Sequence, residues 1–306
     1  MVTGSATGAL RRGLSSPRRW GARDASARAA SMTPAVGWYV LFFLIPLLWM
    51  IRVSFAALQN FHLRYVWSTS AYHQLFHDPL VGELLKRSVI LASVVTAVTF
   101  ALGFPAAWIL SRQPANRRNL ILVLMIVPWW SSYIVRVFAW QMSFGHQGIF
   151  NEFIVWAGLS HHPAQLFEFG WFGVAVAEVN LYLPLMIIPL YMSLERLDTD
   201  LLRAASSLGA GPLRVIRKIV LPLASPGIIA GVIFVFMPMT GEFVAPNLVG
   251  GPGQILFGNQ IQSQFGVTYN WPYGSSLAIV LLLMLMGFLV AVRLIGGYAT
   301  RNLRQA

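Results

Sequence analysis

Six apolar runs of about 20 residues each restrict what this chain can fold into more than any other feature. At 1.5 Å of rise per residue, a helix of that length crosses the hydrocarbon core of a bilayer. The chain is only 10% charged, whereas soluble domains usually have about 25% charged residues. The sequence therefore predicts an all-α membrane protein with six transmembrane helices. The predicted spans lie near 35–55, 88–111, 120–142, 171–193, 225–246 and 276–295.

Prolines lie within several of these runs. Pro128 and Pro238 are predicted to break the third and fifth spans, and Pro46, Pro184 and Pro189 are predicted to break the first and fourth. Such prolines are tolerated in transmembrane helices when neighbouring helices satisfy the freed carbonyl groups. The pattern therefore favours a bundle of several packed spans.

The basic residues predict the orientation of the spans. Most of the 22 Lys and Arg residues fall in 1–34, 112–119, 194–224 and 301–306, which six spans would place on one side. Loops rich in Lys and Arg stay in the cytoplasm, so both termini are expected there, as tails flanking a six-span body over 35–300. The net charge of +12 is thus a topology signal, and no nucleic-acid partner is predicted.

The first 34 residues are rich in Arg, Ser and Ala and contain one acid, Asp24. This composition is also typical of an organellar transit peptide. A disordered cytoplasmic tail is the preferred interpretation.

Several kinds of chemistry are excluded or disfavoured by composition. The chain has no cysteine, which excludes disulfides, thiol nucleophiles and Fe–S clusters. Its two lysines, Lys86 and Lys218, follow Leu and Arg, whereas a Walker A loop needs Gly-Lys-Ser/Thr. His73 and His77 have the i, i+4 spacing of a metal-ligand pair, but two ordinary surface histidines are preferred. The histidines all lie outside the predicted spans, so an intramembrane hydrolase is disfavoured. We expect no catalytic residue, metal or cofactor on this chain.

The loop 194–224 has the pattern of two short helices. Asp198 or Thr199 can cap the first helix, and Gly209 with Gly211-Pro212 can end it. A second basic run, 213–219, ends at Leu221-Pro222. The pair could rest on anionic lipid. Alternatively, it could dock into a groove of a partner protein, because its small residues would allow the partner to approach closely.

The same loop resembles a motif of the permease subunits of binding-protein-dependent ABC importers, E-A-A-x3-G-x9-I-x-L-P. The matching residues are Ala204, Ala205, Gly209, Ile219, Leu221 and Pro222. Arg203 stands where the family usually has Glu. The resemblance implies a type I ABC importer permease fold, with coupling helices between spans 4 and 5 that seat in a partner ATPase. ATP and Mg²⁺ would be bound by that ATPase, with an altered charge partner opposite Arg203.

The predicted spans contain two acids and, away from the span ends, one arginine. They are Arg136 in the third span, Glu178 in the fourth and Glu242 in the fifth. Each carboxylate costs about 2.5–3.5 kcal/mol at the bilayer centre on insertion scales, so each should face the bundle interior and have a partner or a function. Arg136 is the obvious partner, but it can neutralise only one of the two acids.

Aromatic residues lie in register with these charges. Trp129, Tyr133, Arg136 and Trp140 follow the spacing of one helix face, and Glu178 and Tyr182 are four residues apart. Carboxylates beside aromatic rings suit an organic ammonium ion. Packing, or anchoring at the membrane interface, is the competing interpretation.

Two stretches resemble the B-type subunits of spermidine/putrescine importer permeases. These are 128-PWWSSYIVRVFAWQMSFGHQGIFN-151 and 241-GEFVAPNLVGGPGQILFGNQIQSQFGVTYNWPYGSSLA-278, and the likeness covers about 35–300. By analogy, Glu242 is the first candidate for an acid on the translocation path. The predicted path residues are Glu242, Glu178, Tyr182, Tyr133, Trp129 and Arg136.

The resemblance implies a polyamine permease subunit in a bacterial cytoplasmic membrane, with ATP hydrolysis on another subunit. Its expected partners are a second homologous permease, a homodimeric cytoplasmic ATPase, an extracytoplasmic binding protein, the lipid bilayer and a small cationic solute. Similar permeases move opine-type amino-acid derivatives, aminoalkylphosphonates or ferric iron, so these solutes stay open as alternatives. A stand-alone secondary transporter is the remaining alternative, but the sequence has no internal repeat of the kind that many such transporters show.

Overall fold

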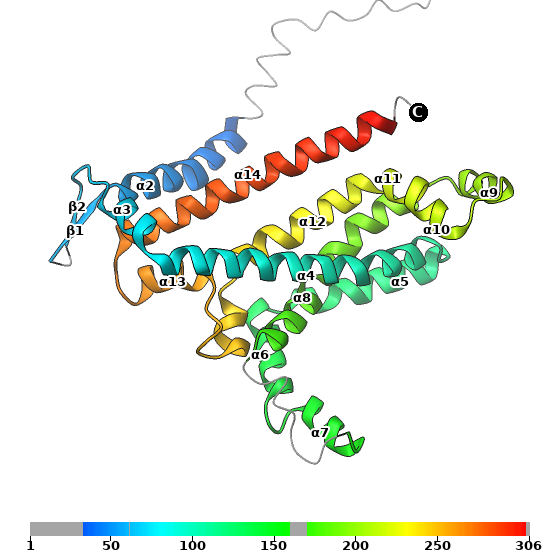
Figure 1. Ribbon diagram of the computed structural model, residues 1–306, viewed down its shortest axis with the longest axis horizontal. Helices are drawn as coiled ribbons and strands as arrows, with labels where there is room; N and C mark the ends of the chain where they lie inside the picture. Colours follow the sequence, from blue (N-terminus) through cyan, green and yellow to red (C-terminus); the bar gives the residue numbers. More distant parts are fainter. Residues whose placement is uncertain (1–32, 61, 160–169, 304–306) are drawn as a thin grey trace, which may run out of the picture. The chain divides into compact units, whose positions relative to one another are not determined.

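The computed structural model describes residues 33–60, 62–159 and 170–303 of the chain (Figure 1). Most of the predicted N-terminal tail and residues 304–306 therefore lie outside the described residues. The chain divides into two compact units, 1–52 and 53–306, which are described separately.

The first unit contains an apolar helix that begins at Thr33 and runs on to Ser54, long enough to cross a membrane. A π-helical turn, η1 (Val40–Leu44), precedes α2 (Ile45–Ser54). In this turn the Ile45 N–H bonds to the Val40 carbonyl, five residues back. The wider turn lies directly before Pro46, which has no N–H to donate.

The core of the second unit is built from three helices that pack against one another. They are α4 (Pro79–Ser111), α8 (Trp171–Glu195) and α12 (Ser225–Thr240), which run side by side in Figure 1. Gly227 makes the contact between α12 and α8 close, because an added Cβ would lie 2.4 Å from the Pro189 carbonyl oxygen. The prediction that Pro46, Pro184 and Pro189 break their spans is wrong. The helix from Thr33 to Ser54 is continuous through Pro46, and α8 is continuous through Pro184 and Pro189.

α4 begins at Pro79, whereas the apolar pattern predicts a start near 88. The side chain of Asp78 accepts a hydrogen bond of 2.9 Å from the Leu80 N–H. This N-cap, with Pro79 at the first helical position, starts the helix before its apolar part.

Two further apolar segments are bent helix pairs. The first comprises α5 (Ala115–Ile126) with η2 (Val127–Trp130), followed by α6 (Tyr133–Phe144) and α7 (Ile149–Trp156), and its bend is 92°. The helix changes to 3₁₀ geometry at Pro128 and breaks after Trp130, so a break near Pro128 is confirmed. The second pair joins the stretch 212–223 to α12 at 71°.

α12 ends at Thr240, shortly after Pro238, so residues 241–246 of the predicted fifth span leave the helix. The described residues contain four helices that are long and apolar enough to span a membrane, or up to six if each bent pair is one span. The prediction of a helical membrane protein is thus confirmed.

The remaining elements are short, apart from the last helix. Strands β1 and β2 form an antiparallel hairpin with Leu58 opposite Leu63, a small departure from an all-helical chain. Leu84, Phe257 and Leu277 belong to a second, smaller core that joins α4, α13 and α14. The bounds are β1 (Ala57–Gln59), β2 (His62–Arg64), α3 (Ser70–His77), α9 (Thr199–Ser207), α10 (Pro212–Val215), η3 (Ile216–Val220), α11 (Leu221–Leu223), η4 (Pro246–Gly250), α13 (Phe257–Gly266) and α14 (Trp271–Leu303).

Candidate functional site

Four polar side chains meet inside the second unit, among the helices of its core. We call Tyr133, Glu178, Tyr182 and Glu242 the carboxyl cluster; they come from α6, α8 and the turn after α12. Glu178 is 0% exposed and Glu242 is 7% exposed. Tyr182 is also buried. Sequence analysis predicted all four as path residues, and the structure brings them together.

Glu178 projects into the core from α8, beside the buried Val174 and Leu181. Its Oε1 accepts a hydrogen bond of 3.1 Å from the Tyr133 hydroxyl. Its Oε2 is buried and has no hydrogen-bond partner among the described residues. A buried, unpaired carboxyl oxygen is costly, so Oε2 of Glu178 has unmet hydrogen-bonding capacity.

Glu242 has a second role that the sequence analysis missed. Its Oε1 accepts hydrogen bonds from the backbone N–H groups of Phe243, Val244 and Ala245, at 2.9, 2.6 and 3.3 Å. These are free donors at the start of a new helical turn, so the carboxylate acts as a cap. The hydroxyls of Tyr133 and Tyr182 lie beside the same carboxylate.

The predicted ion pair between Arg136 and one of the acids is not formed. Glu178 and Glu242 are electrostatic neighbours, and no salt bridge joins Arg136 to either of them within the described chain. The Arg136 guanidinium instead lies over the Trp129 ring, 5.0 Å from its centroid. Two buried carboxyl groups thus interact with each other, and no Lys or Arg of the described residues forms a salt bridge with either.

The prediction that Trp129 shares one helix face with Tyr133, Arg136 and Trp140 is wrong for Trp129, whereas the other three residues do lie on one helix, α6. Trp129 belongs to η2, and the chain bends by 92° before α6 begins at Tyr133. Pro128 interrupts the helical hydrogen bonds there. Trp140 packs against Phe144 and Phe150 and has a structural role.

A buried amide holds the loop that carries Glu242. The Asn259 Nδ2 donates to the Phe243 carbonyl at 2.9 Å and to Asn247 Oδ1 at 2.7 Å. The Phe257 N–H donates to Ser88 Oγ on α4 at 2.9 Å. Asn259 lies in the Gly-Asn-x-Ile part of the quoted 241–278 stretch, but its role needs the three-dimensional contacts to be seen.

His73 and His77 lie on α3, with rings stacked 4.0 Å apart, centroid to centroid. A ring nitrogen of His77 is bonded to the His73 carbonyl oxygen at 2.8 Å. The parts of the chain that the structure describes contain no group of three or more His, Asp or Glu residues able to hold a metal ion.

The first helix of the 194–224 loop is α9, and it forms where the sequence predicts it. The Asp198 side chain caps it by accepting from the Asp200 N–H at 2.8 Å, and Gly209 ends it with φ = +80°. Arg203 pairs with Asp200 at 3.1 Å, and both side chains are 79% exposed. Leu208 is 89% exposed at the end of α9. This helix presents an exposed, partly apolar surface.

The other residues of the loop motif lie differently. Ala204 is exposed, Ala205 is half-buried, and the half-buried Ile219 packs against the core. The second helix does not end at Leu221-Pro222 but continues through Pro222 to Leu223. The π-helical turn η3 immediately before it provides room for the proline. Only the α9 part of the motif is therefore open to a partner.

Comparison with known proteins establishes the family. Residues 99–296 match the family described as "Binding-protein-dependent transport system inner membrane component". The chain belongs to this family. Members of this family are components of transport systems rather than enzymes. The long apolar helices of this chain agree with a position in the inner membrane.

Curated relatives agree with this family. The chain is 38% identical to the "Spermidine/putrescine transport system permease protein PotB" of Escherichia coli K12 over 258 residues, 84% of this chain and 93% of that protein. It is 34% identical to the protein of that name from Haemophilus influenzae, over 83% of this chain and 88% of that protein. It is 31% identical to the E. coli "Inner membrane ABC transporter permease protein YdcU", over 87% and 91%.

A solved structure supports the fold. A chain of a bacterial ABC transporter that imports the acidic polysaccharide alginate matches with a TM-score of 0.71 at 16% identity, over 91% of this chain and 96% of that chain. The predicted type I ABC importer permease fold is thus confirmed. At this identity the likeness concerns the fold alone.

Proposed function

We propose that this inner-membrane component is the permease subunit of an ABC importer for polyamines such as spermidine and putrescine. The observation that carries the proposal is the pair of buried, interacting carboxyl groups of Glu178 and Glu242, neither of which forms a salt bridge with a described Lys or Arg. The names of the relatives at 38% and 34% identity support the same substrate class.

The chemistry of the cluster suits an organic ammonium group. An ammonium between Glu178 and Glu242 would relieve the mutual repulsion of the two carboxylates in a buried site. The unpaired Oε2 of Glu178 would accept one of its N–H donors. The rings of Tyr133 and Tyr182 would add cation–π attraction for the same group. A doubly charged amine fits this site better than an anion.

Arg136 and Trp129 also belong to the proposed path, but they do not contribute a negative charge that would bind the substrate. The guanidinium of Arg136 is held against the Trp129 ring, so it adds positive charge near the cluster without occupying it. A cationic substrate would then be repelled from Arg136 toward the acids.

The assembly that we propose contains this chain, a second homologous permease, two copies of a cytoplasmic ATPase and an extracytoplasmic binding protein. Both termini of this chain would lie in the cytoplasm, on the side where its basic segments gather. ATP and Mg²⁺ would be bound by the ATPase, and this chain would hold no cofactor.

The exposed helix α9 would transmit the motion of the ATPase. This capped helix carries Arg203, Ala204 and Ala205, with Gly209 after its end. In the stretch that follows, Ile219 packs against the core, and Leu221 and Pro222 lie in α11. Closure of the ATPase would displace α9 and switch the bundle between inward-facing and outward-facing states. Substrate released by the binding protein would then pass the carboxyl cluster.

The test is uptake of radiolabelled spermidine and putrescine into liposomes that contain the complete complex. Glu178→Gln and Glu242→Gln each remove one charge from the cluster. Gln can still accept the three backbone hydrogen bonds at position 242, so that variant keeps the cap. We expect each variant to lower the apparent affinity for polyamine at least tenfold, with the complex still assembled.

Glu83→Gln is the matched control, because Glu83 makes an exposed ion pair with Arg87 outside the cluster. It should leave uptake unchanged. ATP hydrolysis stimulated by the binding protein without any polyamine uptake would keep the importer assignment and refute the substrate. Opine-type compounds, aminoalkylphosphonates and ferric iron would then be tested in the same liposomes.

A further inference from the structure

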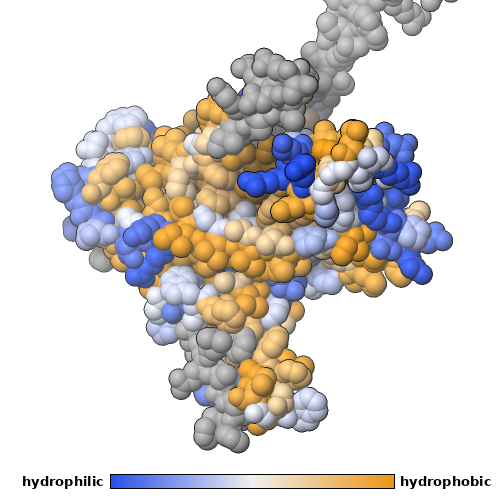
Figure 2. All heavy atoms as spheres, turned by 45° about the vertical axis from the view of Figure 1, so that its right-hand side comes forward, coloured by the Kyte–Doolittle hydropathy of each residue, from blue (hydrophilic) through white to orange (hydrophobic). Residues whose placement is uncertain are grey.

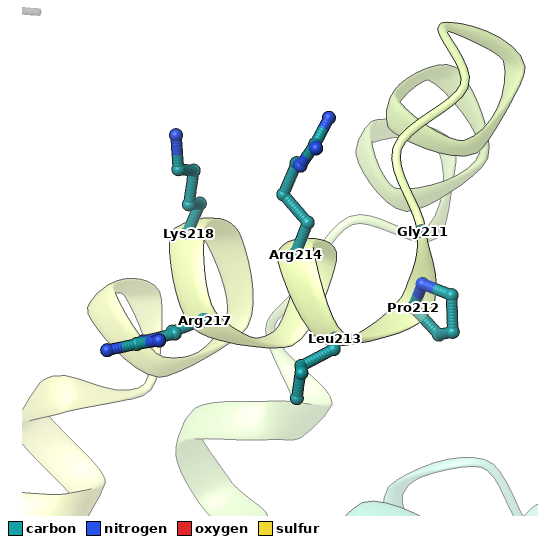
Figure 3. A pocket seen from close by; sticks show the side chains of 6 residues that line it. All are labelled: Gly211, Pro212, Leu213, Arg214, Arg217 and Lys218. Atoms are coloured by element: carbon teal, nitrogen blue, oxygen red, sulfur yellow. The ribbon is translucent and has the colours of Figure 1, made fainter.

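Three basic side chains line a pocket on the stretch 212–223, which leads into α12. We call Arg214, Arg217 and Lys218 the basic cluster; all three are exposed. With Gly211, Pro212 and Leu213 they line a pocket of about 440 Å³. Figure 3 shows Arg214 and Lys218 projecting side by side from one side of the helix, with Leu213 on the opposite side and Arg217 pointing in another direction. The lining of this pocket is mainly apolar, and the three positive charges belong to its lining residues.

The basic cluster has no compensating negative charge. None of its three residues makes an ion pair or hydrogen bond with the residues that the structure describes. Nearby basic residues differ, since Arg118 pairs with Glu195 at 2.6 Å and Arg203 pairs with Asp200. Like charges three and four residues apart on a helix repel each other. The cluster therefore has unmet capacity for an anion.

The fold holds these cations in place at the end of a span. Val215 and Val220, on the other side of the same stretch, are buried against the bundle. The stretch is bent by 71° from α12. If α12 crosses the bilayer, the stretch 212–223 lies at a steep angle to the membrane normal and close to the interface. The stretch has exposed apolar residues, Leu213 and Leu223, as well as exposed basic residues, and this combination is typical of a helix that lies at a membrane interface.

Hydrophilic residues gather toward the margins of the face in Figure 2, and apolar residues cover much of the area between them. In Figure 1 the stretch 212–223 lies between α9, at the far end, and the body of α12. The basic cluster is therefore closer to the apolar, lipid-facing part of the chain than α9 is. This position favours a membrane lipid over the partner that would seat on α9.

We propose that the basic cluster binds the phosphate of an anionic phospholipid in the leaflet next to it. The guanidinium group of Arg214 supplies a forked donor that matches phosphate oxygens, Lys218 beside it adds a point charge, and Arg217 adds a further positive charge on the same stretch. With both termini in the cytoplasm, this leaflet is the cytoplasmic one. The inference does not depend on which solute the importer carries.

The experiment measures lipids retained by the purified complete complex. The complex is exposed to equal amounts of phosphatidylglycerol and phosphatidylcholine in detergent, and bound lipids are counted by native mass spectrometry. We expect the wild-type complex to prefer phosphatidylglycerol. The triple variant R214Q/R217Q/K218Q should retain severalfold less of it. The variant R214K/R217K keeps the charge but removes the forked donors, so it should retain an amount of phosphatidylglycerol between those of the wild type and the triple variant.

The control variant R11Q/R12Q/R18Q removes the same number of charges from another predicted cytoplasmic segment. An equal loss of phosphatidylglycerol in this control would overturn the proposal, because it would show a non-specific effect of net charge. Undiminished phosphatidylglycerol in the triple variant would also overturn it. If the triple variant instead sheds the ATPase subunit and keeps its lipid, the cluster belongs to a protein interface. Displacement of the lipid by inorganic phosphate alone would reassign the site to a free anion.

Discussion

The Tyr133 hydroxyl lies 3.1 Å from Oε1 of Glu178, so a hydrogen bond joins α6 to α8 inside the bundle. α6 follows the 92° bend of the chain at Ser131, and this bond fixes where its first turn lies against α8. The bond also leaves Oε2 as the free oxygen of Glu178. The bend after Pro128 therefore helps to form the carboxyl cluster, because it places Tyr133 where its hydroxyl bonds to Glu178.

Tyr133→Phe should weaken polyamine uptake by raising the apparent KM roughly fivefold, which corresponds to about 1 kcal/mol for one buried hydrogen bond. The ring remains and can still attract an ammonium group, so transport is expected to be weakened rather than abolished. The measurement is spermidine uptake into liposomes as a function of concentration. Tyr39→Phe, at an exposed residue of the first unit, is the control. An unchanged KM would show that the hydroxyl does not position Glu178 for substrate.

Glu242→Ala and Glu242→Gln should differ in stability. Alanine removes the acceptor of three backbone N–H groups, whereas the Gln side-chain oxygen can still accept them. Loss of a helix cap lowers the free energy of unfolding by about 1 kcal/mol, and by more when the backbone N–H groups that it bonded stay buried without an acceptor. We expect the alanine variant to melt several degrees lower than the wild type in detergent, and the Gln variant to melt close to it. Equal melting temperatures of the two variants would contradict a capping role.

Gly258→Ala should disrupt the loop that holds Glu242. An added Cβ at Gly258 would lie 2.4 Å from the Gly241 carbonyl oxygen and 2.6 Å from that of Glu242, so the loop has to move. Gly253 is a matched control in the same segment, with nothing within 4 Å of an added Cβ. We expect Gly258→Ala to reduce both thermal stability and uptake, and Gly253→Ala to change neither. Normal uptake by Gly258→Ala would mean that the loop tolerates a shift and does not set the geometry of Glu242.

The sequence predicts the fold and the residues of the carboxyl cluster well, because long apolar runs and isolated charges within them have few alternative explanations in a membrane. It does not predict the pairing inside the cluster. Arg136 is a reasonable partner for Glu178 by charge alone, but the bend after Pro128 places its guanidinium on Trp129. Helical periodicity assumes an unbroken helix, and a single proline turn invalidates it for every residue beyond the break.

The cap made by Glu242 and the contacts of Asn259 are hidden for a different reason. Both depend on backbone groups of an irregular loop, and such groups leave no pattern in side-chain chemistry. The helix α9, in contrast, is encoded locally: Asp198 caps its start and Gly209 permits the positive φ at its end. Locally specified elements are thus predictable, and contacts between distant segments are not.

Arg203 should decide how well this chain assembles with its own ATPase. The residue is exposed on α9, and its ion pair with Asp200 lies on the surface, where such a pair contributes little to stability. Arg203→Glu restores the residue that is usual in the resembling motif, but it reverses the charge presented to a partner. We expect this variant to fold normally and to retain severalfold less ATPase during purification of the complex. A basic-to-acidic or acidic-to-basic exchange in the ATPase groove that restores retention would identify the partner charge.

Asp200→Asn is the control for this experiment, because it breaks the same surface ion pair without changing Arg203. If Asp200→Asn reduces ATPase retention as much as Arg203→Glu does, the ion pair within α9 matters rather than the charge facing the partner. If Arg203→Glu retains the ATPase fully and still supports uptake, Arg203 has no part in docking. In that case the exposed Leu208 at the end of α9 becomes the residue to test, since an apolar side chain so exposed gains most from burial against a partner.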